Sequence, residues 1–198
     1  MLSDIGSRCA QASRFELVQL FLGEGNLYDG IRTDLIGDKS EFVCDIGYFG
    51  ADKQNIDINL ISNHIGKKTN CVIGVDGALK DAARKTFKGT IDFKNGSSGS
   101  TGAETEDVLL LGDDVVNKTI PVILCAEEDV NGSHGATIGE LDAETLFYFA
   151  ARGIDSAAAE DIMTKGRLEV IVRKIADEKT EQLANEQLHK VLNEVALD

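Results

Sequence analysis

Short runs in which apolar and polar residues alternate follow one another along most of the chain. Between Cys9 and Ala126 these runs read RFELVQLFL, GIRTDLI, EFVCDIGYF, NIDINLI, TNCVIGV, KTFKGTIDF, EDVLLLG and IPVILCA. Alternation with a period of two, with many β-branched and aromatic residues, is typical of β-strands that bury one face. The pattern therefore predicts a mainly β region whose strands are each a few residues long.

Glycine and charged residues separate these strands at nearly regular intervals. The glycines that open the breaks are Gly23, Gly37, Gly50, Gly66 and Gly77. This near-constant pitch fits either an antiparallel sandwich joined by hairpins or a parallel β-helix, in which successive segments coil around one core. Hairpins favour two-residue Asn-Gly or Asp-Gly turns, which the breaks opened by these five glycines lack apart from Asp76-Gly77. The β-helix is therefore favoured, and the sandwich stays open as the alternative.

One stretch breaks the alternation. The run KNGSSGSTGAETED, from Lys94 to Asp107, is small and polar and then acidic. This composition predicts a mobile loop between strands. The run lacks the GxxxxGK[ST] spacing of a phosphate-binding loop, and its acids would repel an anion. No nucleotide site is expected here.

Near the C-terminus the period of the apolar positions changes to that of an α-helix. Asp142 is a suitable N-cap for a first helix, AETLFYFAAR, and Gly153 with Ile154 supplies its C-terminal stop. The change of period divides the chain into a β core over 1–140 and a small helical domain over 141–198. The last segment carries an apolar stripe made of Leu188, Val191, Leu192 and Val195.

The charge of the chain narrows its possible partners. With 34 acidic and 20 basic residues the formal net charge is −14. Nucleic acid and anionic lipid require clustered Lys and Arg, so we expect neither as a partner. No apolar run approaches the roughly 18 residues of a membrane span, and the first residues, MLSDIGSRCAQ, lack the features of a signal peptide. We therefore expect a cytoplasmic protein without a membrane segment.

The cysteines give no disulfide framework. They are far apart in the sequence and form no CxxC pair, so we expect reduced thiols that act as small buried hydrophobes. Cys125 is the exception, because it precedes the acidic run 127–129 and lies shortly before His134. The four are Cys9, Cys44, Cys71 and Cys125.

No enzyme motif is evident. GxSxG, HExxH and GxGxxG are all absent, and the acidic run 127–129 is more typical of a solvated rim than of acid-base catalysis. His134 lies in NGSHGAT among residues too small to shield it. From the pattern alone it is a structural residue, a ligand or a turn residue.

Two long runs resemble the SufB/SufD family of iron-sulfur cluster assembly proteins. They are AEEDVNGSHGATIGELDAETLFYFAARGIDSAAAEDIM and, upstream, GALKDAARKTFKGTIDFKNGSSGSTGAETEDVLLLGDD. The resemblance implies a right-handed parallel β-helix followed by a small C-terminal α-helical domain. It also implies a non-catalytic scaffold that pairs through its β-helix with a SufB-type subunit or with a second copy.

The resemblance assigns roles to particular residues. His134 falls on the family's interface histidine and would be a metal ligand. The C-terminal helices would dock a SufC-type ATPase, with Arg152, Gly153 and Ile154 fixing the turn between the first two. No cofactor would be bound stably by the chain alone, and a transient iron-sulfur cluster would form in the assembled complex.

The chain also departs from the SufB pattern. Ser133 and Gly135 replace the glutamates that flank the histidine, and Val115 or Val116 stands where a cysteine is expected. The chain therefore resembles SufD more closely, and a thiol would come from a partner or from Cys125. The family's N-terminal region has no counterpart here, so we expect a C-terminal core fragment whose first strands near 14–22 leave an edge exposed.

A different class of function also uses the β-helix. Many β-helix proteins bind or cleave polysaccharides in acidic clefts, so a carbohydrate-active or carbohydrate-binding protein is the alternative. It is disfavoured because the chain has no tryptophan for sugar stacking.

Overall fold

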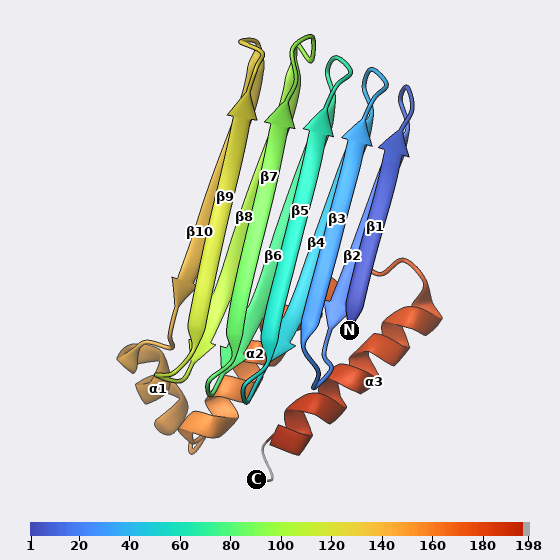
Figure 1. Ribbon diagram of the computed structural model, residues 1–198. Coiled ribbons are helices and arrows are strands. Elements are labelled where there is room, and N and C mark those ends of the chain that lie inside the picture. The colour runs from blue at the N-terminus through green and yellow to red at the C-terminus, as the bar shows by residue number, and fades with distance from the viewer. Residues whose placement is uncertain (196–198) are drawn as a thin grey trace.

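The computed structural model describes residues 1–195, with side chains through Leu192, as ten strands followed by three helices (Figure 1). The side chain of Val195, assigned above to an apolar stripe, lies outside the described part. The strands are β1 (Leu2–Cys9), β2 (Arg14–Phe21), β3 (Leu27–Leu35), β4 (Glu41–Gly50), β5 (Asn55–His64), β6 (Asn70–Lys80), β7 (Arg84–Phe93), β8 (Ser100–Leu111), β9 (Val116–Cys125) and β10 (Val130–Gly139). The helices are α1 (Ala143–Ala150), α2 (Ser156–Val172) and α3 (Glu178–Val195).

The strands form two parallel sheets. The odd sheet has the order β1-β3-β5-β7-β9, and the even sheet has the order β10-β8-β6-β4-β2. In Figure 1 the odd strands run upward in front, the even strands run downward behind them, and successive turns advance from right to left. This coil is right-handed. The predicted right-handed parallel β-helix is confirmed, and the antiparallel sandwich is wrong.

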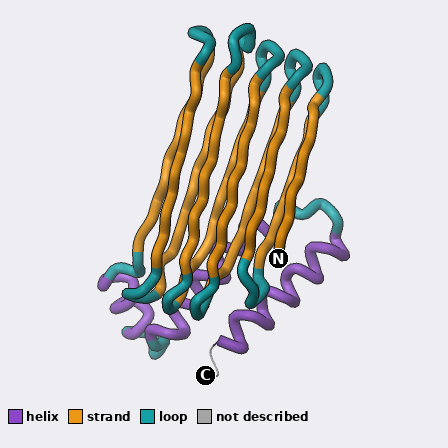
Figure 2. The backbone as a smooth tube through the Cα atoms, viewed as in Figure 1, coloured by secondary structure: helices purple, strands orange, loops and turns teal. Residues whose placement is uncertain are grey.

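One turn of the coil, here called a rung, consists of an odd strand and the even strand that follows it. Leu27 on β3, for example, is paired with Ile56 on β5, the equivalent strand of the next rung. Within the β-helix, short loops connect the strands at their two ends (Figure 2). Because each rung has two such loops, the spacing of Gly23, Gly37, Gly50 and Gly66 marks half a rung. The break expected at Gly77 is wrong, since Gly77 lies within strand β6 and pairs with Tyr48 and Val108.

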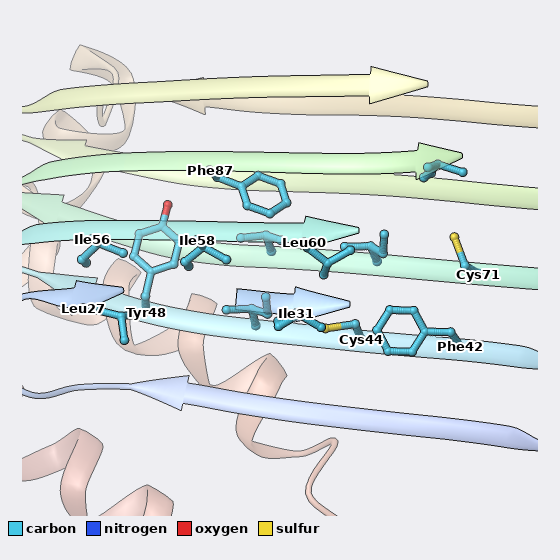
Figure 3. Close-up of a cluster of buried hydrophobic side chains, with 14 of the residues drawn as sticks. Leu27, Ile31, Phe42, Cys44, Tyr48, Ile56, Ile58, Leu60, Cys71 and Phe87 are labelled. Carbon is cyan, nitrogen blue, oxygen red and sulfur yellow. The ribbon is translucent and has the colours of Figure 1, made fainter. Parts of the chain in front are cut away.

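The space between the sheets is filled by apolar side chains from both. Tyr48, Ile58 and Phe87 lie between the two layers (Figure 3), and all three are fully buried. Phe15 of the first rung stacks on Phe42 with ring centroids 5.6 Å apart. In a parallel coil every inward position meets its equivalent one rung away, so similar apolar residues stack along the axis.

Helices α2 and α3 pack against the outer face of the even sheet. Leu168 and Val172 of α2 and Leu188 of α3 form one apolar cluster with Phe49 and Leu109 of the sheet. Ion pairs join α2 and the segment after it to the same sheet: Arg167 to Asp107 at 3.2 Å and Lys174 to Asp45 at 2.6 Å. The helices thus share a core with the β-helix. No helix within residues 1–195 is long and apolar enough to cross a membrane.

The expected mobile loop from Lys94 to Asp107 is wrong. The turn covers only residues 94–99, and Ser100 begins strand β8. Glu104 and Glu106 point inward from this strand and are buried, so an acidic composition that indicated solvent belongs to interior positions. His134 likewise lies within strand β10 instead of in a turn.

His64 is a buried histidine without a site of its own. Its Nδ1 lies 2.7 Å from the Thr69 hydroxyl, which is hydrogen-bonded to the Ser100 hydroxyl, and its ring packs on Phe93 with centroids 4.6 Å apart. Burial disfavours the charged imidazolium and lowers the pKa of His64 to about 4.

This buried histidine should make the protein less stable in mild acid. In the unfolded chain an imidazole titrates near 6.5, so between this value and about 4 the unfolded state binds more protons than the folded state. We expect the free energy of unfolding to fall by about 2 kcal/mol between pH 7 and pH 5 from this residue. Urea unfolding across this range should show a shallower pH dependence for His64→Gln than for the wild type. Equal slopes would contradict the assignment.

Candidate functional site

The last rung, β9 and β10, ends both sheets. Within residues 1–195 each of these strands pairs on one side only, with β7 and β8 respectively. The side chains on their inward faces therefore cover the end of the apolar interior. No further rung within the described residues covers these side chains in turn. The inward positions, taken from the register, are Asn117, Thr119, Pro121, Ile123 and Cys125 on β9 and Val130, Gly132, His134, Ala136 and Ile138 on β10.

His134 is the titratable side chain on the inward face of β10. Its register partner is Glu104 of β8, and its Nδ1 lies 3.2 Å from Oε1 of that carboxylate. The His134 side chain is 25% exposed, whereas that of Glu104 is 3% exposed. The imidazole thus bridges a buried carboxylate and the open end of the coil.

The small residues around His134 in the sequence divide between the two faces of β10. Strand residues alternate between faces, so Ser133 and Gly135 point to the opposite side of β10. Gly132 and Ala136 flank the imidazole on its own face. A Cβ at position 132 would lie 3.0 Å from atoms of Ile123 and Phe93, so a side chain there would crowd the interior next to His134.

A buried ion pair lies beneath this rung. Lys85 of β7 pairs with Glu106 of β8, and both side chains are fully buried. The Lys85 ammonium also donates to Asn117 Oδ1 at 3.0 Å and approaches Thr119 Oγ1 at 3.4 Å. Burial lowers the pKa of Lys85, although the carboxylate of Glu106 opposes the change. The two sheets are therefore joined by charge at this level of the core.

Glu104 carries the second buried carboxylate. Burial raises the pKa of Glu104, the neighbouring Glu106 raises it further, and His134 acts in the opposite direction. The carboxylate lies against the backbone of Gly89, where an added Cβ would come within 1.7 Å of Oε2. A glycine on β7 thus makes room for the carboxylate under His134.

The cysteines divide as the sequence indicated. Cys9, Cys44 and Cys71 are buried, and Cys125 is exposed. Burial raises the pKa of Cys71 to about 12, which makes its thiol unreactive at neutral pH. Cys125 ends β9, where the chain turns toward β10, and lies about four residues along the strands from the level of His134, or roughly 13 Å. The structure therefore does not bring Cys125 and His134 together.

The acidic run 127–129 supports the last turn. Glu127 accepts a hydrogen bond from the backbone N–H of Gly96 at 3.0 Å, and Asp129 accepts one from the Ser98 hydroxyl at 2.7 Å. Both partners belong to the turn one rung earlier. This agrees with a structural role at the rim of the coil.

The turn after α1 is a Schellman motif. Gly153 has a φ of +76°, and the N–H of Ile154 donates to the carbonyl of Phe149 at 3.1 Å. The Arg152 guanidinium lies 3.6 Å from the centroid of the Tyr148 ring. The predicted caps Asp142 and Gly153 are thus confirmed, and the three residues 152–154 set the direction in which the chain leaves α1.

Helix α1 buries none of its residues. Phe147 is 74% exposed and Tyr148 is 54% exposed. Large aromatic side chains on a surface helix are typical of contact with another protein. Helix α1 therefore presents an exposed apolar surface next to the turn.

Reasoning from the sequence missed Glu104, Glu106 and Lys85. The available signal was the alternation of β8 itself, because positions 104 and 106 continue the inward register of Val108. Polar inward positions obscured this signal. Among the described residues no group of three or more His, Cys, Asp or Glu side chains is arranged to hold a metal ion. His134 and Glu104 are therefore the titratable pair that this end of the coil brings together, and within the described residues they form no complete metal site.

Comparison with known proteins agrees with this architecture. A family model described as the SufBD core domain of the SUF system for FeS cluster assembly matches residues 2–167. The iron-sulfur cluster assembly protein SufD of Bacillus subtilis is 26% identical over 170 residues, which cover 86% of this chain and 39% of that protein. SufD of Escherichia coli is 33% identical over 110 residues, which cover 56% of this chain and 24% of that protein.

A plant protein is also similar. The chloroplastic SufBD family protein ABCI8 of Arabidopsis thaliana is 29% identical over 115 residues, covering 58% of this chain and 21% of that protein. The chain thus matches about two fifths or less of the length of these relatives. The family match, which extends over the whole β-helix and into α2, disfavours the carbohydrate-active alternative. The chain belongs to the SufBD core-domain family of iron-sulfur cluster assembly proteins.

Proposed function

We propose that this chain is a SufD-like scaffold subunit that helps to assemble an iron-sulfur cluster at an interface with a SufB-type subunit or a second copy. The observation that carries the proposal is the position of His134, held over a buried carboxylate on the open inward face of the last rung. A partner that covered this rung would meet the imidazole directly. Free cysteines and an acidic composition fit action in the cytoplasm.

Pairing through the last rung is supported by its exposed edges. Strands β9 and β10 leave one row of backbone N–H and C=O groups unpaired within the described chain, and such an edge readily adds a strand from another chain. The large apolar side chains on the inward face of these strands are partly exposed, at 37% for Ile123 and 43% for Ile138. Burial of this surface would favour association.

His134 would supply one ligand to iron, and a neutral imidazole suits iron in protein sites. Because the described residues offer no complete ligand set, thiolates and further ligands would come from the partner. Iron and sulfide are then substrates, and the cluster is transient. We therefore propose that the chain alone binds no cluster stably and acts as a scaffold instead of a catalyst.

Anaerobic reconstitution with ferrous iron and sulfide tests the proposal. The chain alone, a SufB-type subunit alone and the purified pair are compared by the visible absorption of the cluster per folded complex. We expect little absorption from the chain alone and more from the pair than from the sum of its parts. A stable cluster on the chain alone, or a pair that adds nothing, would contradict the scaffold role.

We further propose that α1 and the turn after it dock the SufC-type ATPase. The exposed aromatic residues of α1 provide the apolar surface, and Arg152, Gly153 and Ile154 fix its direction relative to α2. Deleting the whole helical region is a poor test, because α2 and α3 cover the apolar outer face of the even sheet.

A point variant in α1 tests the docking surface more directly. Phe147→Asp should weaken binding of the ATPase about tenfold or more, because an exposed aromatic anchor commonly contributes over ~1 kcal/mol to an interface. The melting temperature should change little, since Phe147 is 74% exposed. Leu183→Asp on α3, where the leucine is 56% exposed, is the matched control. Equal affinities for wild type and Phe147→Asp would place the docking surface elsewhere.

A further inference from the structure

The two ring nitrogens of His134 have different surroundings. Nδ1 lies 3.2 Å from Glu104 Oε1, which is within the outer range of a hydrogen bond. That oxygen is buried and has no other hydrogen-bond partner within the described residues, so it is free to accept a hydrogen bond from Nδ1–H. The two ring nitrogens point to different sides of the imidazole. Because Nδ1 faces Glu104, Nε2 is directed away from it.

The carboxylate is fixed from the opposite side. Its Oε2 rests against the Gly89 backbone, in space that a side chain at that position would occupy. Parallel register places Glu104 directly beside His134 on the neighbouring strand, and both strands lie within a continuous sheet. Glu104 therefore cannot move away from the imidazole without disturbing β7 or β8.

We propose that Glu104 is a positioning residue for His134: it accepts a hydrogen bond from Nδ1–H, holds the ring, and leaves the Nε2 lone pair for iron. A carboxylate that holds the second nitrogen of a histidine fixes its tautomer and makes it a better ligand. The role in iron binding rests on the proposed function, whereas the fixed tautomer does not. Glu106 serves a different purpose, because it neutralises Lys85.

The tautomer can be read in the protein without iron. Two-bond ¹H–¹⁵N correlation of the imidazole, at a pH where the ring is neutral, distinguishes a proton on Nδ1 from one on Nε2. We expect the Nδ1–H form in the wild type and a shift toward the Nε2–H form in Glu104→Met, which has no acceptor. Glu104→Gln keeps an acceptor oxygen and should largely preserve the Nδ1–H form.

Two further variants control for loss of buried charge and for failure to fold. Glu106→Gln removes a buried charge that pairs with Lys85 instead of His134, so it should leave the tautomer unchanged. Glu104→Asp keeps the charge but withdraws the carboxylate by one methylene, so it should also shift toward Nε2–H. If Glu104→Met fails to fold, the tautomer measured in Glu104→Asp tests the proposal instead. An unchanged tautomer in Glu104→Met, or in Glu104→Asp where it stands in, would overturn the proposal.

The second measurement is how cluster formation in the reconstituted pair depends on the concentration of ferrous iron. Removal of a residue that orients a metal ligand typically weakens metal binding about 10- to 100-fold. The ferrous iron concentration that gives half-maximal cluster should rise about tenfold or more in Glu104→Met, with Glu104→Gln closer to wild type. An unchanged iron dependence in a variant whose tautomer has shifted would overturn the positioning role. Normal cluster in His134→Ala together with a shifted tautomer in Glu104→Met would instead overturn the proposed function and leave the fixed tautomer standing.

Discussion

Replacing Lys85 with methionine should lower the free energy of unfolding by about 3–5 kcal/mol. The Lys85 ammonium is fully buried, pairs with Glu106, and contacts Asn117 and Thr119 of the next rung. Without it two carboxylates, Glu104 and Glu106, would share a buried region that has lost its neutralising cation. Unfolding in urea at neutral pH measures the loss.

A double variant separates the charge from the packing. Replacing a whole buried ion pair with apolar residues of similar size is often neutral or stabilising. Lys85→Met combined with Glu106→Met should therefore recover most of the stability that Lys85→Met loses. A single variant within about 1 kcal/mol of wild type, or a double variant no better than the single, would show that the pair does not neutralise the core as described.

The β-helix could be predicted because most strands keep a period of two with apolar residues inside. The run EFVCDIGYF is an example, since Phe42, Cys44, Ile46 and Tyr48 are all fully buried. The length of a rung could not be read from the glycines, because four of them mark both turns of each coil and Gly77 lies within strand β6. The helix caps at Asp142 and Gly153 depend on local chemistry and were predictable for that reason.

The last two rungs were harder because their interior is partly polar. Glu104, Glu106 and Lys85 occupy positions that the preceding rung fills with Ile73, Val75 and Ile56. Only pairing across rungs reveals that their charges meet. A single strand pattern carries no information on such partners. This is why the first half of β8 resembles a loop in the sequence, and why His134, with Gly132 and Gly135 nearby, suggests a turn.

The candidate site was predictable in part. His134 stands out in the sequence by its small neighbours and by a family resemblance, but its partner Glu104 lies on β8, one full rung earlier in the chain. The contact between them therefore exists only in the coiled chain. Cys125, which is close to His134 in sequence, lies at the end of β9 and away from the level of His134, because residues close in sequence are spread along adjacent strands.

His134→Ala should nearly abolish cluster formation in the pair and leave the fold intact. The imidazole is 25% exposed and flanked on its face by glycine and alanine, so its removal should cost less than the roughly 2 to 5 kcal/mol of emptying a core site. Alanine has no lone pair to offer iron. His189→Ala, an exposed histidine on α3, makes the same chemical change away from the last rung and should behave as wild type.

Cluster yield per folded complex, measured with the melting temperature on the same samples of wild type, His134→Ala and His189→Ala, is the most direct test. We expect His134→Ala to pair with the SufB-type subunit, to melt within a few degrees of wild type, and to yield little cluster. A destabilised His134→Ala variant with normal cluster yield per folded complex would show that His134 is a structural residue and would contradict its role in cluster assembly.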